Sequence, residues 1–216
     1  MTDLLDAVKA KDADRARAVA AERPDLRLAR DDDGLLPATH ALYRGQDDLA
    51  RELLPDDTQL SVFEAASFGR AERVAELLAA DPLLIRDWSP DGFTVLHLAL
   101  FSGSVVTVRT VLDHGPDLEA PSRSSVARDV RPLHTAAFVR RPDLAAMLID
   151  AGADVNSRES GGFTPLHAAA ENGDVEMVRL LLSRGADRAL TDDKGRTAAD
   201  LARARDDAHV TALLGG

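Results

Sequence analysis

One short motif recurs along this chain at a nearly constant interval. A histidine follows a leucine and precedes small or apolar residues at His97, His134 and His167, and Asp200 holds the same frame. The successive spacings are 37, 33 and 33 residues. A fixed period of this length is typical of stacked repeats, in which each unit covers the apolar face of its neighbour. The period therefore predicts a stacked array of repeats and argues against a single catalytic loop.

In the unit at residues 161–193, each helix boundary has its own sequence signal. Thr164 is a favourable N-cap, and Pro165 suits the first position of a helix, where its missing N–H leaves no bond unmade. A second helix is indicated by the apolar stripe within 175–182, and Gly185 ends it. Each unit is therefore predicted to be two helices joined by a turn and followed by a projecting loop.

The same unit contains the motif of a known family. Thr164-Pro165-Leu166-His167-Ala168-Ala169, followed by Gly173 and by Gly185-Ala186-Asp187, resembles the ankyrin repeat, and the strong match covers residues 91–216. The resemblance implies an all-α solenoid of helix-turn-helix units with projecting β-turn loops. It also implies protein binding through a concave face that the first helices and the loops form together.

The whole chain, residues 1–216, is predicted to be one domain of about seven units. In the first 90 residues the match is weaker, but Pro24 and Pro82 mark two similar stretches 58 residues apart. Because this spacing is less than two periods, we expect about ten residues of projecting loop to be missing near residues 53–61. The predicted units are a cap at 2–32, a degenerate unit at 33–58, full units at 59–90, 91–128, 129–160 and 161–193, and a cap at 194–216.

The three histidines at the repeat interval are interpreted as structural. The resemblance implies that His97, His134 and His167 stand at the start of a first helix, hydrogen-bond locally and tie one repeat to the next. Equivalent histidines spread along a solenoid do not converge on one point, as catalytic groups must. Thr94 occupies the place of Thr164 and belongs to the same structural motif.

The candidate partner-binding residues occupy positions that the resemblance places on the concave face or in the projecting loops. When the units are aligned, four successive first helices each end near an aromatic residue, although the chain has only eight aromatic residues. An exposed apolar stripe of this kind is typical of protein interfaces. The alternative is that the rings pack between neighbouring first helices. The candidates are Tyr43, Arg44, Phe68, Phe101, Phe138, Val139, Glu171 and Asn172 at the helix ends, and Trp88, Phe93 and Phe163 in the loops.

One connector, around residues 120–131, contains an insertion of about four residues. Its arginines, which could read an acidic group on a partner, are Arg123, Arg128 and Arg131. A catalytic triad of Ser124, Asp129 and His134 can be drawn here, but nothing in the sequence supplies an oxyanion hole or orients the base. The insertion is therefore interpreted as a longer binding loop.

Composition excludes several classes of function. The 26 basic residues face 37 acidic ones, and a net charge of −11 argues against binding nucleic acid. The acidic pairs and triplets are interpreted mainly as solvated turn residues. The chain has no cysteine, no HExxH, no P-loop and no GxGxxG, so we expect no metal, no cofactor and no catalysis. No apolar run approaches membrane length and no signal peptide is evident, which predicts a cytoplasmic protein without membrane contact.

The sequence thus predicts a non-catalytic protein-binding module, monomeric, with a partner of unknown identity. An alternative is an inhibitor or immunity-type partner of one enzyme or toxin, whose acidic loops would cover a basic active site. The two hypotheses differ in salt dependence, which is weak for apolar anchors and steep for acidic loops. The composition, rich in Ala, Arg and Asp, suggests a bacterium with a GC-rich genome.

Overall fold

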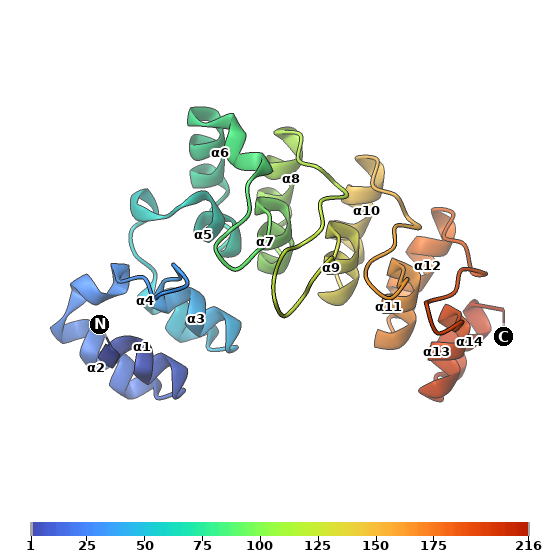
Figure 1. Cartoon of the computed structure of the whole chain (residues 1–216), viewed down its shortest axis with the longest axis horizontal. Coiled ribbons are helices and arrows are strands. Elements are labelled where there is room, and N and C mark those ends of the chain that lie inside the picture. The colour runs from blue at the N-terminus through green and yellow to red at the C-terminus, as the bar shows by residue number, and fades with distance from the viewer. Residues whose placement is uncertain (1, 216) are drawn as a thin grey trace.

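The computed structural model describes residues 2–215 as a curved row of helix pairs (Figure 1). The described residues form no sheet, only isolated β-bridges between single residues. The α-helices are α1 (Thr2–Lys9), α2 (Ala13–Glu22), α3 (Pro37–Tyr43), α4 (Asp47–Leu53), α5 (Val62–Ser67), α6 (Ala71–Ala80), α7 (Val95–Ser102), α8 (Val105–Asp113), α9 (Pro132–Phe138), α10 (Pro142–Asp150), α11 (Pro165–Asn172), α12 (Val175–Ser183), α13 (Ala198–Ala204) and α14 (Ala208–Leu213). The 3-10 helices are η1 (Pro24–Leu28), η2 (Asp57–Gln59) and η3 (Pro82–Arg86). The prediction of an all-helical repeat array is confirmed, and each predicted unit contains one helix pair.

Helix α11 shows how the repeat sequence fixes a helix. The Thr164 hydroxyl accepts a hydrogen bond from the backbone N–H of His167, and Pro165 occupies the first turn. Gly173 ends the helix with φ of +64°, a left-handed conformation that glycine adopts without a steric penalty. Within residues 2–215, none of the helices has the length and hydropathy that a membrane span requires.

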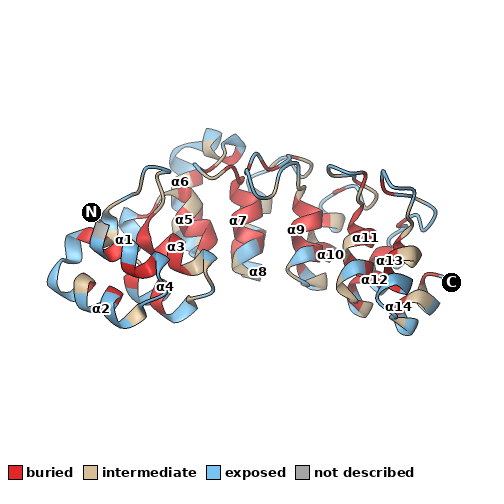
Figure 2. Cartoon of the chain, turned by 60° about the horizontal axis from the view of Figure 1, so that its bottom comes forward, coloured by how far each residue is buried: buried red, intermediate tan, exposed pale blue. Residues whose placement is uncertain are grey.

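The hydrophobic core is divided into two clusters. One lies among α1 to α4 and includes Leu4 and Leu49, and the other includes Leu36 just before α3 and runs through the third unit to the last. Only Leu54 is packed against both clusters among the described residues. Helix α5 packs closely on α7, and α3 on α1, whereas α3 and α5 make little direct contact. Figure 2 shows many buried residues in the first helices of the longer block, among which α7, α9 and α11 have neighbouring first helices on both sides.

The break between the two clusters coincides with a shortened connector. Residues 54–61 join α4 to α5 through eight residues. The connectors at 23–36, 81–94, 151–164 and 184–197 each have fourteen residues, and that at 114–131 has eighteen. The connector 54–61 is therefore six residues shorter than the fourteen-residue connectors. We expected about ten missing residues, and part of the remainder is missing from α4, which has 7 residues where α6 has 10. The expected four-residue insertion at 114–131 is confirmed.

Candidate functional site

Two of the repeated histidines bridge neighbouring units in the same way. The Nε2 atom of His97 lies 2.9 Å from the carbonyl oxygen of Val130, and that of His167 lies 3.0 Å from the carbonyl oxygen of Arg196. A carbonyl can only accept, so Nε2 carries the proton in both rings. The Nδ1 atom of each ring then accepts from the hydroxyl of the threonine three residues earlier, at 2.8 Å. Each histidine thus joins its own helix cap to the connector that follows its unit.

His134 makes only half of this arrangement. Its Nε2 atom lies 3.0 Å from the carbonyl oxygen of Phe163, but Arg131 stands where the other units have threonine. The Nδ1 atom consequently has no partner among the described residues. Burial lowers the pKa of His97 and of His134 to about 4, and it also lowers the pKa of His167. Buried, neutral and one unit apart, these rings are placed to stabilise the stack.

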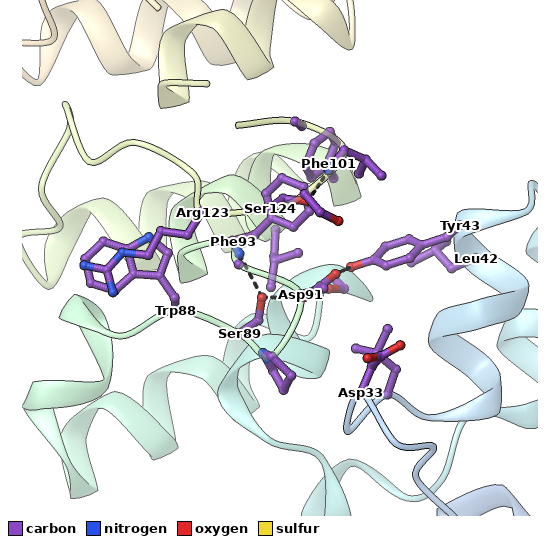
Figure 3. A pocket seen from close by; sticks show the side chains of 18 of the residues that line it. Asp33, Leu42, Tyr43, Trp88, Ser89, Asp91, Phe93, Phe101, Arg123 and Ser124 are labelled. Atoms are coloured by element: carbon purple, nitrogen blue, oxygen red, sulfur yellow. Dashed lines mark hydrogen bonds between the residues drawn. The ribbon is translucent and has the colours of Figure 1, made fainter. Parts of the chain in front are cut away.

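A groove of about 1090 Å³ lies beside the ends of the first helices α3, α7 and α9 (Figure 3). These helix ends contribute Tyr43, Phe101 and Phe138, and the inserted loop contributes Val126. Phe138 is 70% exposed and Val126 is 89% exposed, while Tyr43 and Phe101 are 45% and 38% exposed. The groove therefore exposes several large apolar side chains to solvent.

One hydrogen bond in the wall of the groove joins two units that are not adjacent in sequence. The Tyr43 hydroxyl, at the end of α3, donates a 2.6 Å hydrogen bond to the Asp91 carboxylate in the loop before α7. The Ser89 hydroxyl donates to the other oxygen of Asp91 at 2.5 Å. Because the connector 54–61 is too short to form a projecting loop, the loop of the fourth unit reaches α3 of the second. The shortened connector thus shapes the site.

The other side of the groove is held by Trp88 and Arg123. The Arg123 guanidinium stacks 3.3 Å from the centre of the Trp88 ring, and the indole N–H donates to the carbonyl oxygen of Pro121 at 3.0 Å. Arg131 donates to the carbonyl oxygen of Glu119 at 2.6 Å. Two of the three arginines that we expected to bind an acidic group on a partner therefore already make contacts within the chain.

Phe93 does not add to the exposed apolar stripe, contrary to our expectation. It is 7% exposed and packs edge-on against Phe101, with ring centroids 5.4 Å apart. Two hydrogen bonds between Phe93 and Ser89 close the loop before α7, and the buried ring of Phe93 lines the groove. Phe93 supports Phe101 instead of offering its own face.

Several other candidates lie between units. Phe68 is half-buried and packs against the core of the first two units, which is the alternative arrangement considered for the aromatic residues. Phe163 lies against His167, with ring centroids 5.2 Å apart. Arg44 donates to His40 at 3.1 Å. These contacts use the side chains to join elements of the fold.

The remaining candidates lie at the ends of α9 and α11, outside the groove. Asn172 donates to the carbonyl oxygen of Ala137 at 3.4 Å, which connects the two helices. Val139 is half-buried and Glu171 is exposed. The structure therefore does not bring Val139, Glu171 or Asn172 together with the aromatic residues of the groove.

Sequence reasoning did not single out several residues that line the groove, among them Val126, Asp33 and Asp47. Val126 is the apolar tip of the inserted loop, and a valine in an otherwise polar insertion was the available signal. Asp33 and Asp47 are exposed carboxylates that line the groove with Tyr43; Asp33 belongs to an acidic triplet interpreted as solvated turn residues, and Asp47 was not singled out. Across residues 2–215, no group of three or more potential ligand side chains is placed to hold a metal ion.

Family comparisons agree with this architecture. Residues 62–159 match a family model described as ankyrin repeats (3 copies), and residues 148–202 match one described as ankyrin repeats (many copies). The chain belongs to the ankyrin-repeat family. The two matches leave the first two ankyrin units outside, which are also the units with their own core cluster.

Curated relatives align with only part of this ankyrin array. The probable E3 ubiquitin-protein ligase XBOS31 of Oryza sativa subsp. japonica is 32% identical over 106 residues, which are 49% of this chain and 23% of the relative. Protein phosphatase 1 regulatory subunit 27 of Mus musculus is 38% identical over 94 residues, which are 44% of this chain and 58% of the relative. The similarity extends to ankyrin units and not to whole proteins.

Proposed function

We propose that this chain is a non-catalytic protein-binding module, and that its groove holds the partner. The observation that carries the proposal is the exposure of Phe138 and Val126 on one groove, next to Tyr43 and Phe101. Large exposed apolar side chains in a preformed hollow are typical anchors of protein interfaces. Because the groove is built on packed helices, little conformational entropy remains to be lost on binding.

Replacing Val126 and Phe138 with serine tests the proposal. Both side chains are more than two-thirds exposed, so the double variant should lose less than about 1 kcal/mol of unfolding free energy. Affinity purification from a native lysate should recover a protein with the wild type and not with Val126→Ser/Phe138→Ser. Leu83→Ser/Val106→Ser is the matched control, because these apolar residues are also exposed but do not line the groove. Equal recovery with both variants would remove the groove from the proposal.

A regulator of one enzyme is the second candidate. It is favoured by the exposed carboxylates of Asp33 and Asp47 on the groove and by the similarity to the mouse relative, a regulatory subunit of a phosphatase. A partner held mainly by these carboxylates would associate much more slowly at high salt. A partner held mainly by the apolar residues would show little salt dependence. The association rate of the recovered partner at low and high salt therefore separates the two candidates.

A further inference from the structure

We infer that the groove binds a linear segment in which a lysine or arginine stands next to large apolar residues, with the basic side chain on the α3 side. This inference rests on the proposed function and specifies the chemistry of the partner. The groove, at about 1090 Å³, is slightly larger than the range for small-ligand pockets, about 300–1,000 Å³, and its exposed rings are typical of protein contacts. A short peptide segment fits such a space.

The charges on the groove are unbalanced. Its charged lining residues, as far as the structure describes them, are Asp33, Asp47, Asp91 and a single cation, Arg123. Asp91 accepts hydrogen bonds from within the chain, through Tyr43 and Ser89. The carboxylates of Asp33 and Asp47 are exposed and make neither a hydrogen bond nor an ion pair with any described side chain. Both carboxylates therefore remain free to meet a cation.

The charges are also separated in space, which gives the groove a direction. Figure 3 shows Asp33 and Tyr43 on one side and the stacked pair of Trp88 and Arg123 on the other. Arg123 is thus held away from the carboxylates of Asp33 and Asp47 by its stacking on the Trp88 indole ring. A partner side chain of positive charge is attracted to the α3 side and repelled from the Arg123 side.

The apolar contacts define where the rest of the segment lies. Phe101 and Phe138, at the ends of successive first helices, and Val126 from the inserted loop all line this groove. A segment whose basic side chain reaches Asp33 or Asp47 can place its neighbouring apolar side chains against these three residues. Charge thus orients the segment, and apolar burial supplies most of its affinity.

Selection from a random linear peptide library displayed on phage tests the inference. The wild type should enrich sequences with Lys or Arg beside large apolar residues. Asp33→Asn/Asp47→Asn should enrich apolar sequences without the basic residue, and Val126→Ser/Phe138→Ser should enrich neither. The control Glu72→Gln/Asp113→Asn removes the same charge from exposed positions outside the groove and should behave as the wild type.

A synthetic peptide of the enriched sequence gives the quantitative result. Its affinity for Asp33→Asn/Asp47→Asn should be about fivefold lower than for the wild type and for Glu72→Gln/Asp113→Asn, the size expected for exposed ion pairs. If the selected peptides need Val126 and Phe138 for binding but contain no basic residue, this inference is overturned and the proposed function is unaffected. Recovery of no groove-dependent sequence would also overturn it, while the affinity purification decides the proposed function separately.

Discussion

Between about pH 7 and about pH 5, the wild-type array should lose about 4 kcal/mol more unfolding free energy than a variant without His97 and His134. Both rings are buried, and burial holds the pKa of each at about 4. An imidazole in the unfolded chain has a pKa of about 6.5. The expected difference follows from these two values.

The sign follows from which state binds the proton. Above about pH 6.5 the imidazole is neutral in both states, and the stability is fully present. As the pH falls through this value, the unfolded chain takes up protons that the buried rings of His97 and His134 do not accept. Stability is therefore lost between about pH 6.5 and the folded pKa of about 4, and each ring contributes about 2 kcal/mol of that loss by about pH 5.

Urea unfolding of the wild type and of His97→Gln/His134→Gln at both pH values measures this effect. Glu159 acts in the opposite direction, because burial and the nearby Glu171 carboxylate raise its pKa to about 7. The folded state therefore favours protonated Glu159 and gains stability as the pH falls. Since Glu159 is present in both proteins, its contribution cancels in the difference. The same pH slope in the two proteins would show that the histidines are not held neutral by the fold.

The repeat period and the cap residues were enough to predict the helices. Thr164, Pro165 and Gly173 act through bonds and backbone angles within a few residues, so their effect is local and can be inferred from one unit. The structural role of His97 and His167 could also be predicted, because their hydrogen bonds recur with the repeat. Features that each unit repeats can be predicted from the sequence.

The burial of the aromatic residues could not be predicted in this way. Phe68 and Phe101 stand at equivalent positions, yet Phe68 packs into the N-terminal cluster and Phe101 lines the groove. The difference arises at the shortened connector, where Tyr43 meets Asp91 across 48 residues of sequence. Aligning the units assumes that each unit has the same structural neighbours, and this assumption fails where one projecting loop is absent. The shape of the candidate site therefore depends on the irregular part of the array.

Gly92→Ala should destabilise the fold by about 3 kcal/mol, whereas Gly185→Ala should cost about 1 kcal/mol. Both glycines have φ of +89°, a left-handed conformation that is strained for alanine. At Gly185 an added Cβ meets nothing within 4 Å. At Gly92 it would lie 2.5 Å from backbone atoms of Arg123 and Ser124, which cannot move without displacing their loop. The pair of variants therefore separates the conformational cost from the cost of the close approach.

The close approach at Gly92 also holds the wall of the groove. The Arg123 N–H donates to the Gly92 carbonyl oxygen at 2.7 Å, which fixes the inserted loop against the loop before α7. Displacing this contact should move Val126 away from Phe138, so Gly92→Ala should weaken binding of a groove-dependent peptide at a temperature where both variants are folded. Gly185→Ala lies outside the groove and should bind as the wild type does. Equal stability losses, or equal affinities, would show that the two loops are not joined at Gly92, and the inserted loop would then lose its place as a wall of the site.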